Sequence, residues 1–323
     1  MKKILVAAIV LLIVGLSAAY VVIPRYAFSL ITDYEPYTFE KVFENDTMRV
    51  NYGIYDNSSP LDYGYEFQEI EYLSHPDSIK LSGWFVEASK PTFRCIVILH
   101  GRTSNRLKTM KFLELYKEAG LDSIYNFFIP DLRNSGKSET ASTMMGYEFA
   151  EDIYSTLINL TLQRKQTDFV IYAFSMGAMG TAVMLNNQEW RDNLMFNDIV
   201  IDKLIFDSPL TNVFGTIKRQ GSNGGYPSFI INNTLDLMND ATFGFAENMR
   251  LSQLAENIPM PLLIIQGDRD QTTLNEFLQA ELEEMNLSRV TVEMFENDRH
   301  VQIYQTPEHK ERYTKIVNDF IRN

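Results

Sequence analysis

Residues 171–178 read Ile-Tyr-Ala-Phe-Ser-Met-Gly-Ala, and the fold follows from this stretch. An apolar segment, predicted as a buried strand, runs directly into Ser175, and an apolar helical segment follows at residues 179–185. The positions two before and two after the serine hold small residues, Ala173 and Gly177. A nucleophile elbow has this order of strand, tight turn and helix, and small flanking residues let strand and helix approach each other. The stretch predicts Ser175 as a nucleophile; the alternative is an ordinary helix start with the serine as N-cap.

On both sides of this turn, apolar runs alternate with amphipathic segments. Short continuous apolar runs are typical of strands that are buried on both faces of a parallel sheet. Strands are predicted at residues 81–87, 95–99, 125–129, 169–173, 204–206, 262–265 and 290–295, and helices at 107–119, 149–160, 179–185, 274–285 and 307–321. The order predicts an α/β domain over residues 66–323, with a mainly parallel central sheet flanked by helices.

Two segments interrupt or precede the alternation. Residues 210–258 combine glycines and asparagines with apolar patches, and such a long insert is rarely without function in a compact domain. We expect a small, partly helical cap over the site, with a disordered surface loop as the alternative. Residues 26–65 contain many Tyr and Phe without a clear period, which predicts a linker that packs on the domain.

Residues 1–25 form a separate segment. Residues 4–23 carry no charge, and as a helix they span about 30 Å, the thickness of a bilayer core. Lys2 and Lys3 precede them, so the positive-inside rule places the catalytic domain outside the cytoplasm. A cleaved signal peptide, with residues 17–19 as the cleavage site, is the alternative and would give a secreted protein.

The composition excludes several classes of protein. The chain has 323 residues, 45% of them hydrophobic, and a formal net charge of -13. An acidic protein lacks the basic surface that nucleic acids require. The single cysteine, Cys95, excludes an intramolecular disulfide framework and a cysteine-rich zinc site, and its apolar neighbours predict a buried side chain. The sequence is that of a globular protein whose partners are not nucleic acids.

A serine nucleophile needs a base, and histidine is the usual one at neutral pH. The chain has four histidines. His75 precedes a proline, His100 ends a predicted core strand, and His309 lies in the first turn of the last helix. His300 follows the last predicted strand and precedes the closing helix, which is where the base belongs when the order is serine, acid, histidine. We therefore predict His300 as the base.

The third member of a triad is an acid that orients the imidazole. The predicted strand at 262–265 is followed by Gln-Gly-Asp-Arg-Asp, so Asp270 and Asp268 are both candidates. Asp270 is preferred, and Asp268 is read alternatively as a carboxylate that caps its own loop. Asp207, at the end of the preceding predicted strand, is a further alternative.

An acyl-transfer site also needs donors for the oxyanion. The backbone N–H of Met176 opens the helix after the nucleophile, and the segment His100-Gly101-Arg102 follows an earlier strand. We expect the N–H groups of Met176 and Arg102 to form the oxyanion hole, with Gly101 permitting close approach of the backbone. The Arg102 side chain is expected to point to solvent, or alternatively to meet an anionic substrate.

These motifs, in this order, resemble the α/β-hydrolase superfamily over residues 65–323. The resemblance rests on residues 100–101, 131–138, 173–178, 207–209, 267–270 and 300, and is strongest to serine hydrolases with short caps, a branch that includes membrane-linked bacterial hydrolases, dipeptidyl-peptidase-like domains and acyl-thioesterases. Ala173, where a glycine is usual, departs from the pattern but is still small. The resemblance implies Ser175, Asp270 and His300 as the triad, and Arg102 and Met176 as oxyanion donors.

Together these features predict an exported or membrane-anchored serine hydrolase that cleaves a carboxylic ester or thioester through an acyl-enzyme on Ser175. No metal or organic cofactor is expected, and the expected partner is a small-molecule acyl substrate. The alternatives are an aminopeptidase or other amidase with the same triad, and a non-catalytic binding module on the same fold. The sequence gives no indication of the oligomeric state.

Overall fold

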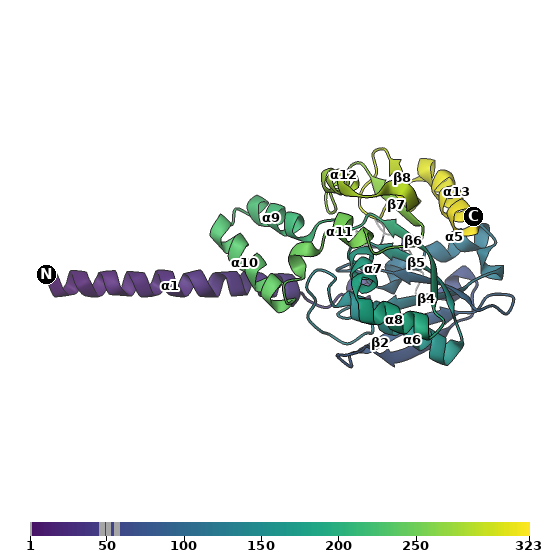
Figure 1. Ribbon diagram of the computed structural model, residues 1–323, viewed down its shortest axis with the longest axis horizontal. Helices are drawn as coiled ribbons and strands as arrows, with labels where there is room; N and C mark the ends of the chain where they lie inside the picture. Colours follow the sequence, from purple (N-terminus) through teal and green to yellow (C-terminus); the bar gives the residue numbers. More distant parts are fainter. Residues whose placement is uncertain (1, 45–48, 50–52, 55–58) are drawn as a thin grey trace.

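The computed structural model describes residues 2–44, 49, 53–54 and 59–323 (Figure 1). Its centre is an eight-stranded sheet with the order β1-β2-β4-β3-β5-β6-β7-β8. The strands are β1 (Gln68–Leu73), β2 (Lys80–Val86), β3 (Arg94–Leu99), β4 (Asn126–Asp131), β5 (Asp168–Phe174), β6 (Val200–Asp207), β7 (Leu262–Gly267) and β8 (Val290–Phe295). In this order, the neighbouring strands β4-β3-β5-β6-β7-β8 are all parallel. Strand β2 is antiparallel to both β1 and β4. The predicted α/β fold with a mainly parallel sheet is confirmed.

The sequence did not predict β1, and the reason is its position at the edge of the sheet. Ile70 and Tyr72 are buried, whereas the residues between and around them are exposed. An edge strand that faces the core on one side alternates apolar and polar residues, so it lacks the continuous apolar run of the inner strands.

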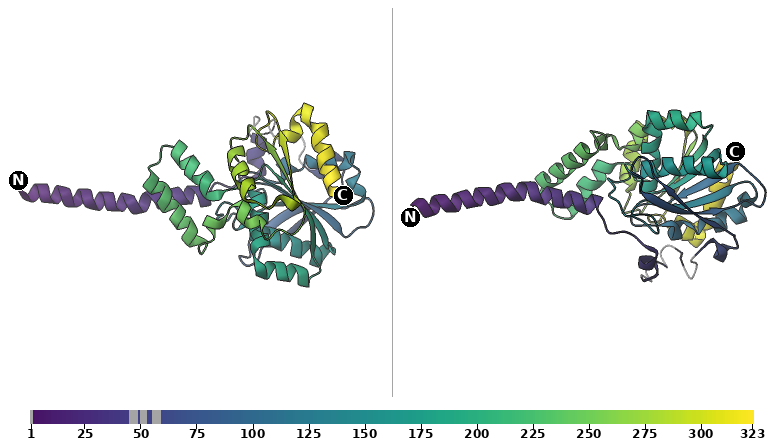
Figure 2. Two further views of the ribbon diagram at one scale, coloured as in Figure 1. Left: turned by 45° about the horizontal axis from the view of Figure 1, so that its top comes forward. Right: turned by 90° about the horizontal axis from the view of Figure 1, so that it is seen from below.

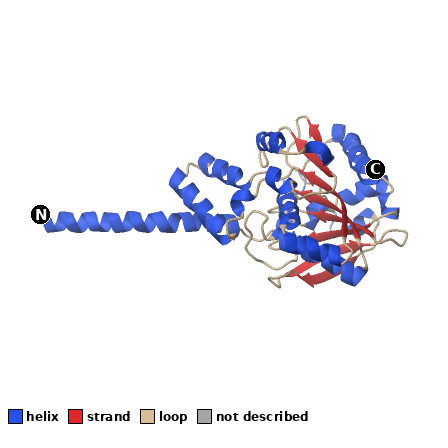
Figure 3. Cartoon of the chain, in the orientation of Figure 1, coloured by secondary structure: helices blue, strands red, loops and turns tan. Residues whose placement is uncertain are grey.

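Helices cover both faces of the sheet (Figure 3). The helices are α1 (Lys2–Thr32), α2 (Phe39–Glu44), α4 (Arg106–Thr109), α5 (Phe112–Glu118), α6 (Phe149–Arg164), α7 (Met176–Asn186), α8 (Gln188–Phe196), α9 (Val213–Asn223), α10 (Ser228–Ala241), α11 (Leu251–Ala255), α12 (Asn275–Glu284) and α13 (Pro307–Arg322). The helix predicted at 107–119 is divided into α4 and α5, and α8 was not predicted.

Two hydrophobic clusters, one on each face, follow from the alternation of side chains along the strands. On β5, Ile171 and Ala173 belong to the cluster that contains α6 and α7. Val170 and Tyr172 belong to the opposite cluster, which contains α5 and α13. Both faces of the inner strands are therefore covered, and Cys95 on β3 is buried as expected.

The segment between β6 and β7, which holds the predicted cap, is helical in the structure. It contains α9, α10 and α11 and the short helix Ala246–Asn248. Figures 1 and 2 show α9 and α10 on the side of the sheet from which α1 projects. The division into a leader, a linker, a catalytic domain and a cap stays a prediction, and residues 45–48, 50–52 and 55–58 of the predicted linker lie outside the described residues.

The N-terminal helix α1 extends to Thr32, beyond the boundary predicted at residue 25. Its C-terminal part packs on α10: Tyr20 stacks on Phe229 with 5.6 Å between ring centroids, and the Thr234 hydroxyl donates to the Pro24 carbonyl over 3.3 Å. Among the described residues, the structure contains no helix with the length and apolar character that a membrane span requires. The transmembrane helix predicted over 4–23 is therefore not supported.

Candidate active site

The candidate residues meet at the C-terminal ends of the parallel strands, because these ends lie on the same side of the sheet. Ser175 directly follows β5 and precedes α7. Its backbone has φ 51° and ψ −116°, a conformation that L-residues rarely adopt, and its N–H donates to the Asp207 carbonyl over 3.1 Å. Strain of this kind costs about 1–3 kcal/mol and is concentrated at functional sites. The geometry is that of the predicted strand–turn–helix elbow and not of an ordinary N-cap.

Two glycines bring the loop after β3 against this turn. A Cβ atom on Gly177 would lie 2.5 Å from the His100 carbonyl oxygen, and one on Gly101 would lie 2.8 Å from the Ser175 Cβ. Neither position accommodates a side chain without movement of the backbone. The absence of side chains here lets the loop that carries Arg102 lie next to the start of α7, as two donors of an oxyanion hole require.

His300 lies in the loop after β8 and is paired with Asp270 from the loop after β7. The distance from His300 Nδ1 to Asp270 Oδ2 is 2.7 Å. An ionised carboxylate can only accept, so this contact places the imidazole proton on Nδ1 and leaves Nε2 as the basic nitrogen. The arrangement is the one by which an acid orients a catalytic imidazole.

The Asp270 carboxylate is buried and held by several donors. Oδ1 accepts from the backbone N–H groups of Thr272 and Thr273, each over 2.8 Å, and Oδ2 accepts from the Thr273 hydroxyl over 2.7 Å. Burial alone would raise the pKa of Asp270, but the hydrogen bond and the charge of His300, with the Thr273 donors, lower it below its usual value. Asp270 is therefore ionised at neutral pH.

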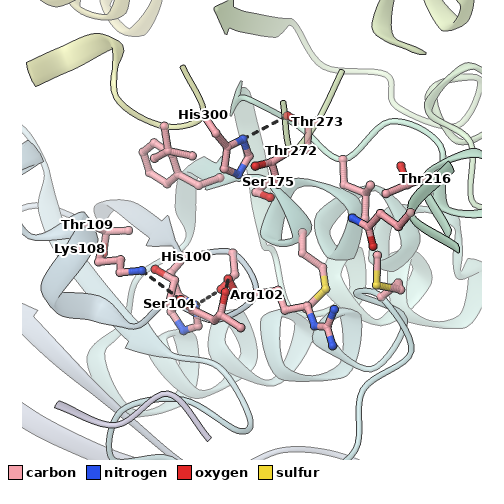
Figure 4. A pocket seen from close by; sticks show the side chains of 18 residues that line it. His100, Arg102, Ser104, Lys108, Thr109, Ser175, Thr216, Thr272, Thr273 and His300 are labelled. Atoms are coloured by element: carbon pink, nitrogen blue, oxygen red, sulfur yellow. Dashed lines mark hydrogen bonds between the residues drawn. The ribbon is translucent and has the colours of Figure 1, made fainter. Parts of the chain in front are cut away.

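Ser175 and His300 line one pocket of about 250 Å³ at this edge of the sheet. In Figure 4 both side chains project into the pocket, with the imidazole beside the serine. Arg102 and Met176 line the same pocket. The structure thus brings together the predicted nucleophile, base and oxyanion donors, with Asp270 behind the imidazole.

The two alternative acids are placed elsewhere. Asp268 is exposed, and its Oδ1 accepts over 2.7 Å from the N–H of Asn297, which lies in the loop after β8. Asp207 is buried, and it accepts from the Tyr313 hydroxyl over 2.5 Å and the Ser208 hydroxyl over 2.8 Å. His300 contacts Asp270, so the geometry favours Asp270 as the acid.

His100 also lines the pocket, but its two ring nitrogens serve the backbone. Nδ1 lies 2.7 Å from the Gly101 carbonyl, and Nε2 accepts from the Leu132 N–H over 2.9 Å. Burial lowers its pKa to about 4, so the ring is neutral. His100 thereby ties the loop after β3 to the loop after β4 and is not available as a base.

The Arg102 side chain is partly exposed and lines the pocket, and its guanidinium is engaged with the end of α1. Its Nη2 donates to the carbonyls of Leu30 and Ile31, over 3.2 and 2.9 Å, and its guanidinium lies 4.4 Å from the ring centroid of Tyr34. The last carbonyls of a helix lack partners within the helix and favour a cation. Arg102 therefore joins the candidate oxyanion loop to the C-terminal end of α1, a contact that was not predicted from the sequence.

The sequence analysis also missed two hydroxyl residues that support the pair of Asp270 and His300. The Thr273 hydroxyl donates to Asp270 and lies 3.2 Å from His300 Nδ1, and the Ser208 hydroxyl accepts from the Val301 N–H over 3.1 Å. The signal for Thr273 was its spacing, three residues after an aspartate, which is common where a side chain organises its own turn. Ser208 belongs to the segment 207–209 that supports the resemblance, but nothing in that segment indicated a bond to Val301.

Comparisons with known proteins agree with this architecture. Residues 94–229 match the family model described as the alpha/beta hydrolase fold, whereas no curated protein matches the chain. Solved structures that resemble it include an esterase of Pyrococcus furiosus, at 24% identity with a TM-score of 0.61 over 82% of this chain and 94% of that one. An esterase of Exiguobacterium antarcticum shares 19% identity with a TM-score of 0.53, over 78% of this chain and 99% of that one.

A third similar structure is a membrane phospholipase A described as a bacterial virulence factor, at 16% identity with a TM-score of 0.54 and 100% coverage of both chains. These identities are low, and what the structures share with this chain is the arrangement of its strands and helices. With the match over 94–229, they confirm the resemblance found in the sequence: the chain has the alpha/beta hydrolase fold.

Proposed function

We propose that this protein is a serine hydrolase that cleaves a carboxylic ester or thioester through an acyl-enzyme on Ser175. One observation carries the proposal: a serine in a strained turn shares a pocket with a histidine whose other nitrogen is held by a buried carboxylate. A hydroxyl is a poor nucleophile unless a base removes its proton, and this arrangement supplies the base.

The mechanism follows from the positions of these groups. Ser175 Oγ attacks the acyl carbon while His300 Nε2 takes its proton, and the carbonyl oxygen becomes an oxyanion that the N–H groups of Arg102 and Met176 stabilise. The tetrahedral intermediate collapses, and the imidazolium gives its proton to the leaving alcohol or thiol. In the second step, His300 Nε2 takes a proton from a water molecule, which attacks the acyl carbon of the acyl-enzyme. The imidazolium then gives this proton to Ser175 Oγ as the carboxylic acid leaves, which restores the serine hydroxyl. Asp270 stabilises the imidazolium during both acylation and deacylation.

The direct test is hydrolysis of p-nitrophenyl butyrate by the wild-type protein and by Ser175→Ala. We expect the substitution to reduce kcat on the order of 10⁶-fold, since the nucleophile acts as a unit with its base. A variant that retains the wild-type rate would refute the proposal. Ser222→Ala is the matched control, because this serine is exposed on α9 and does not line the catalytic pocket, and it is expected to retain the wild-type activity.

Two features favour an ester over an amide. Two of the similar structures are named esterases and a third is named a phospholipase A, and both names denote enzymes that hydrolyse esters. Peptidases of the related branch usually carry an additional domain that restricts access, and nothing in the sequence resembles one. The aminopeptidase reading predicts faster turnover of aminoacyl amides than of esters, and the binding-module reading predicts turnover of neither.

We further propose that residues 4–23 attach the protein to a membrane, with the catalytic domain outside the cytoplasm. The support is the sequence, which has no charge over these residues, and the exposure of apolar side chains such as Ile4 and Leu11 along α1. The membrane phospholipase A aligns with the chain over its full length. After cell fractionation, the full-length protein is expected in the membrane pellet. Recovery of a shortened chain in the medium would instead indicate a cleaved leader.

A further inference from the structure

We propose that an apolar chamber between α1, α9 and α10 receives the acyl chain of the substrate that is bound at Ser175. The inference rests on the proposed function and makes it more specific, because it names the substrate class: esters of medium- to long-chain fatty acids. It also assigns a role in substrate binding to the C-terminal end of α1.

The chamber has a volume of about 170 Å³. Ala27, Leu30 and Ile31 line it from α1, and their spacing puts all three side chains on one face of that helix. Ile217 from α9 and Ile231 from α10 line the facing walls. Aliphatic side chains on three helices thus surround the space, which matches the chemistry of an alkyl chain.

The chamber adjoins the catalytic pocket. Gln220, on α9, lines both spaces. Arg102 lines the catalytic pocket, and its guanidinium is hydrogen-bonded to the carbonyls of Leu30 and Ile31, which line the chamber. The two spaces are therefore neighbours, with Gln220 and the Arg102 contact between them. In this proposal, an acyl chain whose carbonyl carbon lies at Ser175 extends past Gln220 into the chamber.

One polar group that lines the chamber, the Thr234 hydroxyl, is engaged with the protein itself, which disfavours water beside it. The Thr234 hydroxyl is bonded to the carbonyls of Pro24 and Ile230, over 3.3 and 2.8 Å. A water molecule needs two to four polar partners to be stable in a buried site, whereas an alkyl chain gains free energy from each methylene that it removes from water. The position of the chamber next to the catalytic pocket favours the acyl chain of a substrate over an unrelated apolar ligand.

Because α1 forms one wall, changes on this helix are expected to alter chain-length selectivity. Ala27→Trp places a large ring where the chamber now holds a methyl group, whereas Leu30→Ala widens the chamber. Tyr26→Trp is the matched control: Tyr26 neighbours Ala27 on the same helix, is exposed, and does not line the chamber. The readout is the ratio of kcat/KM for p-nitrophenyl decanoate to kcat/KM for p-nitrophenyl butyrate.

The experiment uses the full-length chain in phosphatidylcholine nanodiscs, so that detergent does not occupy the chamber. We expect Ala27→Trp to lower the decanoate-to-butyrate ratio by about tenfold, the effect of a few lost methylene contacts in an apolar pocket. Leu30→Ala is expected to move the preferred ester toward longer chains, and Tyr26→Trp to leave the ratio as in the wild type. Fluorophosphonate labelling of each variant verifies that the site is folded.

An unchanged ratio in both Ala27→Trp and Leu30→Ala, with labelling intact, would overturn the inference while leaving the proposed esterase function in place. Failure of the proposed function itself is seen separately, as a wild-type protein that hydrolyses neither ester and is not labelled.

Discussion

The ends of β6 and β7 lie side by side, and each delivers a buried carboxyl group to the same edge of the sheet. Their surroundings differ. Asp270, after β7, meets the His300 imidazole and two backbone N–H groups, whereas Asp207, at the end of β6, meets the hydroxyls of Tyr313 and Ser208. Burial raises the pKa of both groups; the imidazole reverses this for Asp270, but the hydroxyls do not, and the pKa of Asp207 remains raised to about 6.

The comparison shows that the topological position of a carboxyl group does not decide its role. The acid of a triad could lie at the end of either strand, and the sequence analysis named both Asp207 and Asp270 as candidates. The hydrogen bond from the His300 imidazole helps to keep Asp270 ionised and able to orient a base, whereas the pKa of Asp207 is raised to about 6 and its bond to the Tyr313 hydroxyl joins β6 to α13. The substitutions below test whether the two carboxyl groups differ as strongly in function as they do in surroundings.

The largest difference is expected between Asp270→Asn and Asp207→Asn in the turnover of p-nitrophenyl butyrate. An asparagine at 270 no longer holds the proton of His300 on Nδ1, so kcat is expected to fall on the order of 10³- to 10⁴-fold. The same substitution at 207 leaves the imidazole paired and is expected to cost less than about tenfold. Equal losses in steady-state kinetics would mean that both carboxyl groups serve the base, and a larger loss at 207 would reverse the assignment.

A smaller effect is expected at the third strand end of this edge, where Arg102 follows β3. Arg102→Met keeps the backbone N–H but loses the bonds to the end of α1, so the oxyanion donor is less firmly placed; we expect kcat to fall about tenfold with little change in KM. Arg102→Lys, which keeps a cation near the helix end, should recover part of the loss. A raised KM with unchanged kcat would show instead that the side chain acts in substrate binding.

The smallest effect concerns stability and pH. The pKa of Asp207 is about 6 in the folded protein and about 4 in the unfolded chain. A raised folded pKa means that the stabilising contribution is fully present at low pH and is lost as the pH rises through about 6. Asp207→Asn removes this titration. Relative to the variant, the wild-type protein is therefore expected to lose about 1 kcal/mol in the free energy of unfolding between about pH 5 and about pH 8.

Urea unfolding of both proteins at the two pH values measures this change. A difference between wild type and variant that is the same at both pH values would contradict the raised pKa.

The fold and the proposed triad were accessible from the sequence because they depend on local patterns. Buried parallel strands appear as continuous apolar runs, and the elbow around Ser175 combines a strand, a helix and two small residues within a few positions. Chain order then left one suitable histidine. Strand β1 was missed because an edge strand with one exposed face has no such run.

The contacts that the sequence did not predict join segments far apart in the chain. The bonds from Arg102 to Leu30 and Ile31 connect residues about seventy positions apart, and no property of either segment alone points to the other. The same holds for the Ser208 hydroxyl and the Val301 N–H. Long-range contacts of single polar atoms depend on the packing of whole elements, and packing is not encoded in local periodicity.

The most direct test of the central claim is covalent labelling of the folded wild-type protein with a fluorophosphonate, followed by mass spectrometry of the modified peptide. The account predicts modification at Ser175, none in Ser175→Ala, and much slower modification in His300→Ala, because the base activates the hydroxyl. Folded wild-type protein that remains unlabelled, or that carries the label on a different serine, would contradict it.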